Sequence, residues 1–292
     1  MALIFVSEGA VADWEQMDDV PSDLNMERGV FAYDSVNDVG IMVQYYHEDD
    51  GVWAYDYNED NWIEKGSAPS DLNTEAGLAC YDSESERLIV LESGNTGRYH
   101  YYSYDYANDD WSDATSRPSG LGSVYGNYYD TESDRCIFLE STSDETIPWS
   151  YDFNNDEWEE LDDGPKMHGE NDALGTCYDS ESDRGIFVER GGSNGYHDVF
   201  AYDFNNDDWE EQSDKPSTLS LGDHGSYYSF DIDACIFVEE GAEEVYAYYL
   251  NNDTWLELED GPEDIDLENG AFYYDIESNR GMFVGWGTDG SR

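Results

Sequence analysis

Short apolar and aromatic segments alternate with polar clusters along the whole chain. The clearest copy spans residues 177–188, where the polar cluster Ser180-Glu181-Ser182-Asp183 separates two apolar segments. This pattern predicts two strands joined by a tight turn, and Asp side chains suit such turns because they bond nearby backbone amides. No segment shows a sustained 3.6-residue apolar period, so we expect essentially no long helix.

A second hairpin follows in each repeat and ends in tryptophan. The tryptophans recur at intervals of 48, 49, 47, 51 and 46 residues: Trp14, Trp62, Trp111, Trp158, Trp209 and Trp255. A tyrosine lies seven residues before five of them: Tyr55, Tyr104, Tyr151, Tyr202 and Tyr248. The first hairpin has its own tyrosine or phenylalanine followed by Asp: Tyr33, Tyr81, Tyr129, Tyr178, Phe230 and Tyr274. Each repeat is therefore a four-stranded antiparallel sheet of strands a to d, and a period near fifty residues is typical of a β-propeller.

The two ends of the chain carry half a repeat each. Residues 3–16 align with strands c and d, and residues 270–286 align with strands a and b. The two halves complete one sheet if the repeats close into a ring, which also protects sheet edges. The sequence thus predicts a single all-β domain over residues 1–292, a six-bladed propeller with one composite blade. The continuous blades are expected at about 29–65, 77–114, 125–161, 174–212 and 226–258.

The Tyr-x6-Trp spacing and the first hairpin that ends in Gly191-Gly192 resemble the kelch family of β-propellers. The resemblance covers the whole chain, although the double glycine is kept in one repeat and weakened in two others, at Ser93-Gly94 and Gly285-Trp286-Gly287. It implies the propeller fold and leaves the function open, because kelch propellers serve many roles.

The net charge of the chain is extreme. It has 70 acidic and 12 basic residues, a net charge of -58. Such a surface repels itself in dilute buffer, whereas about 1 M salt shortens the Debye length to roughly 3 Å. We therefore interpret the chain as a protein of an extreme halophile; the alternatives are a mesophilic acidic protein or a Ca²⁺-rich surface protein. Binding to nucleic acid is disfavoured, because no basic patch exists to release counterions.

The four cysteines occupy equivalent positions in pairs. Cys80 and Cys177 lie at one place in strand a, and Cys136 and Cys235 at one place near the start of strand b. Each strand-a cysteine could face the strand-b cysteine of the following blade, which makes Cys80–Cys136 and Cys177–Cys235 candidate disulfides. Buried free thiols are common in protein cores, and the sequence alone favours that simpler interpretation.

The location of the protein is left open by the sequence. Met1-Ala2 runs directly into a strand, and no apolar segment approaches membrane-spanning length, so membrane insertion is not expected. Disulfides would imply an oxidising compartment. We favour an extracellular or cell-surface domain; the alternative is the cytoplasm of a halophile that accumulates salt.

The loops from strand d of one blade to strand a of the next are expected to surround one mouth of the channel. Seven residues before the strand-a Asp, the blades present Glu27, Glu75, Ser123, Asp172, His224 and Glu268. Glu27, Glu75, Asp172 and Glu268 form a candidate cation site, for which Ca²⁺ is the natural ligand because it takes six to eight oxygens. A monovalent cation is the alternative, and so is a set of solvated acids with no ligand. No other cofactor is indicated.

Three further patterns have mainly structural interpretations. The turns at Asp56, Asp152 and Asp203 have Asp-x-Asn-x-Asp spacing like the start of a calcium loop, but they lack its later glycine and glutamate. The arginines after the a–b turns are expected to pair with the carboxylates of those turns: Arg87, Arg135, Arg184 and Arg280. Trp53 and Trp149 are expected to pack between blades rather than bind sugars.

The function that these patterns favour is a non-catalytic binding module, monomeric, with a protein or a surface glycan as its partner. The expected contact surface is the channel mouth: Asn25, Glu27, Asn73, Glu75, Tyr125, His168, Asp172, His224 and Glu268. No nucleophile elbow, phosphate loop or metal-ligand spacing of the five histidines is present. A carbohydrate-active enzyme that uses funnel carboxylates and an architectural domain of a larger surface protein are the alternatives.

Overall fold

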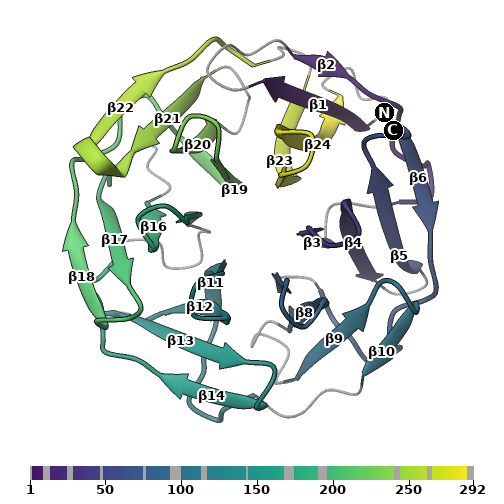
Figure 1. Ribbon diagram of the computed structural model, residues 1–292, viewed down its shortest axis with the longest axis horizontal. Helices are drawn as coiled ribbons and strands as arrows, with labels where there is room; N and C mark the ends of the chain where they lie inside the picture. Colours follow the sequence, from purple (N-terminus) through teal and green to yellow (C-terminus); the bar gives the residue numbers. More distant parts are fainter. Residues whose placement is uncertain are drawn as a thin grey trace.

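The computed structural model describes residues 2–8, 14–24, 29–46, 49–74, 77–92, 100–112, 117–142, 144–167, 174–189, 196–239, 244–261 and 265–287. Its strands form six four-stranded antiparallel sheets arranged around a central axis (Figure 1). The predicted all-β propeller of four-stranded antiparallel blades is confirmed. Among the described residues there is no helix of the length and apolarity that crossing a membrane requires.

Five blades are continuous in sequence, and strands a to d run in order from the axis outward. Blade 1 contains β3 (Gly29–Asp34), β4 (Val39–Tyr46), β5 (Asp49–Asp56) and β6 (Asn61–Glu64). Blade 2 contains β7 (Leu78–Asp82), β8 (Arg87–Leu91), β9 (Tyr101–Asp105) and β10 (Asp110–Ser112). Blade 3 contains β11 (Val124–Asp130), β12 (Arg135–Ser141), β13 (Thr146–Asp152) and β14 (Glu157–Glu160).

Blade 4 contains β15 (Gly175–Asp179), β16 (Arg184–Val188), β17 (Val199–Asp203) and β18 (Asp208–Glu211). Blade 5 contains β19 (Leu221–Ser229), β20 (Ala234–Glu239), β21 (Val245–Tyr249) and β22 (Thr254–Glu257), with the short 3-10 turn η3 (Leu250–Asn252) between its last two strands.

The remaining sheet joins the two ends of the chain, and we call it the composite blade. It contains β23 (Ile265–Asp275), β24 (Arg280–Gly287), β1 (Ala2–Glu8) and β2 (Glu15–Gln16). β1 pairs antiparallel with β24 from Ala2 opposite Trp286 to Glu8 opposite Arg280. The sheet order is β2-β1-β24-β23, so strands c and d come from one end of the chain and strands a and b from the other.

The hydrophobic core lies between the blades. The buried apolar residues form six clusters, and each cluster contains residues of two neighbouring sheets. One of them joins the composite blade to blade 1 through Tyr273 and Met282 against Met42 and Tyr55. Trp149 belongs to the cluster between blades 2 and 3, and Trp53 packs on the cluster next to the composite blade, which fits their expected packing role.

The repeated tyrosine and tryptophan are direct cross-strand neighbours. In blade 4, Tyr202 on strand c faces Trp209 on strand d, with ring centroids 4.6 Å apart. Tyr202 is fully buried, and its hydroxyl donates to Asp207, 2.5 Å away, at the end of the c–d turn. The same tyrosine-to-turn bond occurs in the other continuous blades. The spacing seen in the sequence is therefore the geometry of a four-residue turn.

The turns explain the abundance of Asp. Among the described residues, eleven non-glycine residues have positive φ, and each occupies the last position of an a–b or c–d turn. Ten of them are Asp or Glu and one is Asn. Asp tolerates this left-handed conformation better than most residues, because its short side chain bonds locally. These ten acidic residues thus also have a conformational role.

One position shows how the blades are locked together. The residue just before the strand-a tyrosine faces the second residue of strand b in the next blade. The six pairs are Ala32–Leu88, Cys80–Cys136, Tyr128–Gly185, Cys177–Cys235, Tyr227–Gly281 and Tyr273–Gly40. A large ring therefore meets glycine at three interfaces, a leucine meets alanine at one, and two cysteines meet at the other two.

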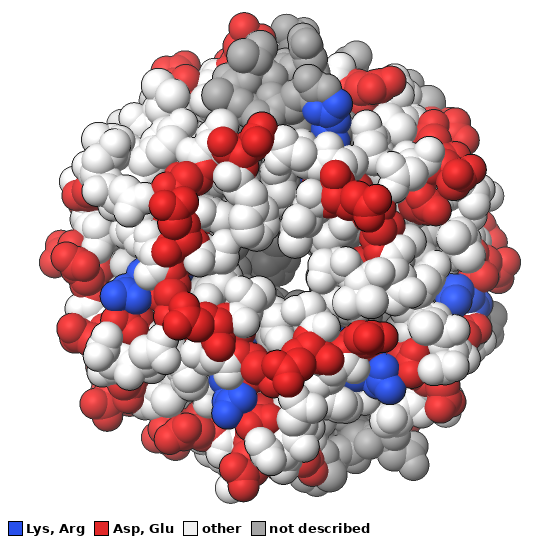
Figure 2. Space-filling view, viewed as in Figure 1, with Lys and Arg blue, Asp and Glu red and all other residues white. Residues whose placement is uncertain are grey.

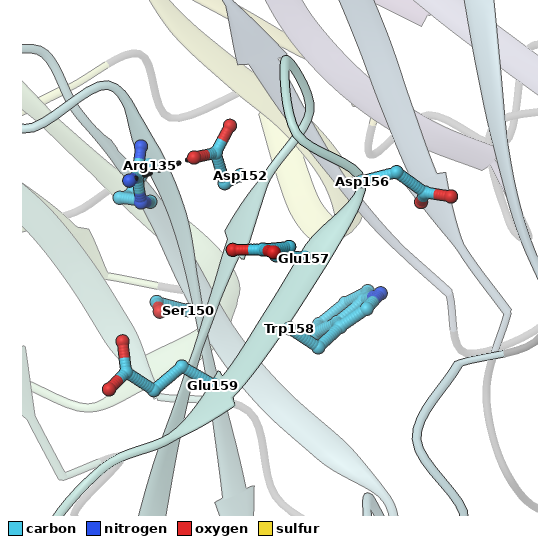
Figure 3. A pocket seen from close by; sticks show the side chains of 7 residues that line it. All are labelled: Arg135, Ser150, Asp152, Asp156, Glu157, Trp158 and Glu159. Atoms are coloured by element: carbon cyan, nitrogen blue, oxygen red, sulfur yellow. Dashed lines mark ion pairs between the residues drawn. The ribbon is translucent and has the colours of Figure 1, made fainter.

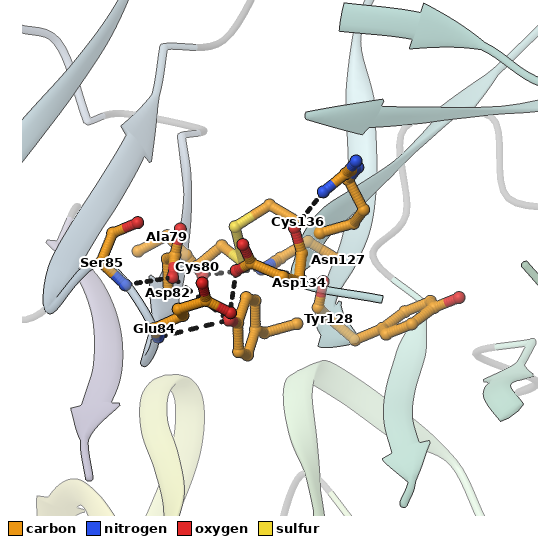
Figure 4. Close-up of a disulfide and its surroundings, with 11 residues drawn as sticks. Ala79, Cys80, Asp82, Glu84, Ser85, Asn127, Tyr128, Asp134 and Cys136 are labelled. Atoms are coloured by element: carbon orange, nitrogen blue, oxygen red, sulfur yellow. Dashed lines mark hydrogen bonds between the residues drawn. A yellow bond between two sulfur atoms is a disulfide. The ribbon is translucent and has the colours of Figure 1, made fainter. Parts of the chain in front are cut away.

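Both cysteine pairs are disulfide-bonded, with Cα–Cα distances of 6.1 Å and 6.0 Å. Figure 4 shows the Cys80–Cys136 bond crossing from blade 2 to blade 3. The free-thiol interpretation that the sequence favoured is wrong for this structure. The reason is tertiary: the inter-blade position brings the two sulfur atoms together although 56 and 58 residues separate the partners.

Blade 5 differs from the expected register. Its strand a ends at Tyr228-Ser229, and Phe230 is the first residue of the turn, because Tyr228 pairs with Cys235 and Ser229 with Ala234. The expected Phe230-Asp231 copy is therefore shifted by two residues. Counting seven residues back from Ser229 leads to Gly222, so His224 is not the counterpart of Asp172.

Candidate functional site

The described part of the chain contains little of the predicted channel mouth. Asn25, Glu27, Glu75, His168 and Asp172 lie outside the described residues, as do the side chains of His224 and Glu268. Asn73 and Tyr125 are described, and both are partly buried. The cation site at Glu27, Glu75, Asp172 and Glu268 accordingly stays a prediction.

Asn73 lies beside a buried carboxylate. Its backbone N–H donates to Glu92 Oε1 at 2.9 Å, and Glu92 is fully buried at the end of strand b in blade 2. His100 Nδ1 lies 3.6 Å from Glu92 Oε2. Arg117, which is 3% exposed, donates to the backbone oxygen of Glu92 at 3.3 Å. These contacts hold the loop after blade 2 against the end of its own strand b.

Blade 4 repeats this arrangement with lysine. Lys215 and Glu189 occupy the positions of Arg117 and Glu92, and both are buried. Burial lowers the pKa of Lys215, and the charge of Glu189 partly offsets that effect. Lys215 Nζ donates to the backbone oxygen of Leu219. A buried cation needs such partners, because an unpaired one would be strongly destabilising. Two of the few basic residues therefore anchor loops.

The calcium-like turns are occupied by internal bonds. In blade 3, Asp152 accepts hydrogen bonds from Asn155 and pairs with Arg135 at 2.8 Å. Although burial alone would raise the pKa of Asp152, these partners lower it. Asn154 donates to Asp134 at 2.8 Å, and Asp156 accepts from Tyr151 at 3.2 Å. Within the described ranges no group of three or more potential metal ligands occurs.

The arginines after the a–b turns have other partners than expected. Arg87, Arg135 and Arg184 pair with the aspartate that ends strand c of their own blade, at 2.9, 2.8 and 2.7 Å. They also donate to carbonyl oxygens of the a–b turn rather than to its carboxylates. For these three arginines the expected carboxylate partner was wrong, because the strands of one blade bring the start of strand b next to the end of strand c.

The a–b turns form a ring of bridges between blades. The Tyr178 hydroxyl lies 2.7 Å from Asp183 in its own turn and 3.0 Å from Asp130 at the end of strand a in blade 3. A tyrosine hydroxyl has one proton, so it donates to one of the two carboxylates at a time. Burial, and then the charge of Asp183, raise the pKa of Asp130. Burial and the bond to Asp183 raise the pKa of Tyr178 well above its usual range.

The same bridge recurs around the channel. Tyr33 lies 2.5 Å from Asp38 and 3.1 Å from Asp275, and Tyr129 lies 2.7 Å from Asp134 and 3.1 Å from Asp82. In blade 2, Tyr81 is flanked by Asp34 and Glu86. In blade 5, Tyr228 is flanked by Asp179 and Asp233.

The interface between blade 5 and the composite blade is the exception. Tyr274 bonds Asn279 and Ser229 there, so both carboxylates of the bridge are replaced by neutral groups.

The a–b turns also differ in their apolar residues. Phe230, Ile276 and Val36 are 49%, 49% and 50% exposed, and they lie in the turns of blade 5, the composite blade and blade 1, which are consecutive around the ring. We call these three residues the apolar arc. The turns of blades 2, 3 and 4 carry Ser-Glu or Thr-Glu at the same positions. Figure 2 shows acidic side chains around the central opening, so the arc is an apolar sector in an acidic surface.

Two grooves lie on the outside of the ring. The first has a volume of about 590 Å³ and is lined by Arg135, Ser150, Asp152, Asp156, Glu157, Trp158 and Glu159 (Figure 3). Its lining contains neither histidine nor cysteine, and Asp152 and Asp156 are already engaged. The second, of about 520 Å³, lies between strand d of blade 4 and the c–d turn of blade 5.

Sequence reasoning missed the apolar arc and the tyrosine bridges. The arc was hidden because the register error in blade 5 assigned Phe230 to a strand. The bridges had a readable signal, since an acid follows each strand-a tyrosine by five residues wherever the turn does not end in Asn279.

Comparisons with known proteins support the fold. No protein-family model matches the chain, and no curated protein matches it significantly. The propeller is similar to a chain in the crystal structure of a nidogen/laminin complex, with a TM-score of 0.56 and 10% identity, covering 89% of this chain and 94% of that one.

Two structures from Bacteroides thetaiotaomicron are also similar. An auxiliary nutrient binding protein has a TM-score of 0.58 at 10% identity, and a protein of unknown function has 0.59 at 12% identity. Each alignment covers 98% of this chain and 76% of the other. At these identities the likeness shows the fold alone.

Proposed function

We propose that this chain is a non-catalytic binding module, a closed six-bladed propeller of kelch type that holds a protein partner against one end of its ring. The observation that carries the proposal is the apolar arc of Phe230, Ile276 and Val36. These three large apolar side chains are about half exposed and lie in the same kind of turn of three consecutive blades, on a chain with a net charge of -58. Exposed apolar patches with a polar rim are typical of protein interaction sites.

The chemistry of the surface specifies the partner. Asp231, Glu277 and Asp38 lie in the same three turns as the arc. A complementary segment therefore carries an apolar side chain beside lysine or arginine, because opposite potentials steer and orient association. A similar chain crystallised in a nidogen/laminin complex and a similar protein described as nutrient binding support a binding role for this fold.

The predicted mouth on the opposite end of the ring is proposed as a second contact surface. It includes Asn73 and Tyr125, with the acids Glu27, Glu75, Asp172 and Glu268 as the proposed site of Ca²⁺ or a monovalent cation. A surface glycan is the alternative ligand there. The loops after blades 2 and 4 are anchored by the buried side chains of Arg117 and Lys215, which supports a well-ordered surface at this mouth.

Adaptation to high salt is part of the proposal. It is supported by the excess of 70 acidic over 12 basic residues and by the Asp-rich turns. The two disulfides support an oxidising, extracellular setting.

A photo-crosslinking experiment in the native host tests the partner site. A benzophenone amino acid is placed at position 230 or 276, and at Thr131 or Ser180 as matched controls, which are the same turn position in blades 3 and 4. We expect one crosslinked protein at 230 and 276 that is missing at 131 and 180. The captured protein, purified, should bind the Phe230→Ser/Ile276→Ser variant at least about tenfold more weakly than wild type, which corresponds to about 1.4 kcal/mol. Equal crosslinking at all four positions, or equal affinity for the variant, would contradict the proposal.

A further inference from the structure

A single Asn-x-Thr triplet occurs in the chain, Asn252-Asp253-Thr254, in the c–d turn of blade 5. This is the acceptor sequence for N-linked glycosylation, which requires an exposed site in a secreted protein. Such a triplet arises easily by chance, so the structure around it must decide whether it is used. Asn252 and Thr254 are both exposed.

The equivalent asparagines of other blades are held inside their turns. Nδ2 of Asn108, Asn155 and Asn206 donates to the aspartate that opens the turn, at 2.8, 2.7 and 2.6 Å. Those aspartates are Asp105, Asp152 and Asp203. The amide nitrogen, the atom that glycosylation uses, is therefore occupied in blades 2, 3 and 4.

Blade 5 differs from blades 2, 3 and 4 at the residue that opens the c–d turn and at the residue that follows the turn. Tyr249 replaces the opening aspartate, so the acceptor that holds Nδ2 of the equivalent asparagine in the other blades is missing in this turn. Thr254 stands where the other blades have Asp110, Glu157 and Asp208, and its hydroxyl donates to Asn252 Oδ1. Tyr249 removes the acceptor that holds the amide nitrogen in the other blades, and Thr254 completes the acceptor triplet of Asn252.

From this paired change we propose that Asn252 carries an N-linked oligosaccharide. Nδ2 forms a bond to the anomeric carbon of a sugar on a lipid-phosphate-linked oligosaccharide. The bond from that carbon to the phosphate oxygen breaks, the lipid phosphate leaves with the electron pair, and the amide nitrogen loses one proton. The two disulfides agree with passage through an oxidising compartment outside the cytosol.

The fold provides room for the attached sugar. Asn252 lines the outer groove of about 520 Å³, together with Glu210, Glu211 and Gln212 of blade 4. The groove faces outward from the rim, and its polar lining suits a carbohydrate. The glycan would cover acidic strand-d residues and would not reach into the inter-blade core.

Peptide mapping of the full chain purified from its native host tests the site. We expect the tryptic or chymotryptic peptide that contains Asn252 to carry a ladder of hexose-type masses. Peptides with Asn155 and Asn206 are internal controls and should be unmodified. The mass should be lost in Asn252→Gln and Thr254→Ala and retained in Thr254→Ser, while circular dichroism of the variants stays that of wild type. Finding the Asn252 peptide entirely at its polypeptide mass, or finding equal adducts on Asn206, would overturn the proposal.

Discussion

Replacing Gly185 by alanine should destabilise the propeller, although the same change usually stabilises a strand. A Cβ at position 185 would lie 2.4 Å from Cε1 and 2.6 Å from Cζ of Tyr128 in the neighbouring blade. That ring is 6% exposed and stacks on Tyr178 with a centroid distance of 5.4 Å, so it has little space to move.

The expected magnitude follows from two opposing effects. Overpacking a close-packed site costs about 1–3 kcal/mol, while removing glycine from a strand gains about 0.5–1 kcal/mol. Gly185→Ala should therefore lower the free energy of unfolding by about 1–2 kcal/mol. In a Tyr128→Leu background the ring atoms are gone, so the same change should become neutral or stabilising. The coupling between the two changes is then about 1–3 kcal/mol.

The free energy of unfolding is measured by urea titration at constant high salt, followed by tryptophan fluorescence. The four proteins of this double-mutant cycle are wild type, the two single variants and the double variant. Gly120→Ala is the control, because a Cβ there would lie at an ordinary 3.4 Å from Trp149, and it should change stability by less than about 0.5 kcal/mol. The reasoning would be refuted by a Gly185→Ala variant as stable as wild type, or by a coupling energy near zero.

Three further predictions concern the disulfides, the tyrosine bridges and salt. Cys80→Ser/Cys136→Ser opens a loop of 56 residues and should lower the free energy of unfolding by about 4 kcal/mol; an unchanged urea midpoint would contradict the disulfide. Because the pKa of Asp130 is raised in the folded protein, its stabilising contribution is present below its unfolded pKa of about 4 and is lost as pH rises through the folded value. Asp130→Asn should thus remove part of the decline in stability with rising pH, and a parallel pH profile would argue against the burial of Asp130 beside Asp183 that raises its pKa. Circular dichroism should show loss of structure on dilution to about 50 mM salt without divalent ions, and full structure there would exclude the halophile interpretation.

The sequence by itself determined the elements of this protein. The Tyr-x6-Trp spacing is the geometry of one hairpin, with Tyr202 opposite Trp209, and the Asp-rich clusters are turns. These signals are local, because a four-residue turn depends on residues within one hairpin. The same reasoning matched residues 3–16 to the missing half of the last repeat, since each half-sheet lacked its own partner strands.

The contacts between blades were decided by the tertiary structure. The disulfide between Cys80 and Cys136 depends on residues 56 positions apart. The fit of Tyr128 against Gly185 likewise depends on two residues of neighbouring blades that are distant in sequence. The register of blade 5 was also decided there: Phe230 lies in a turn because Tyr228 is the residue that packs and bonds like the other strand-a tyrosines. Equivalent positions filled by Cys, Tyr or Ala share no local pattern, because only the volume left by the neighbouring blade selects among them.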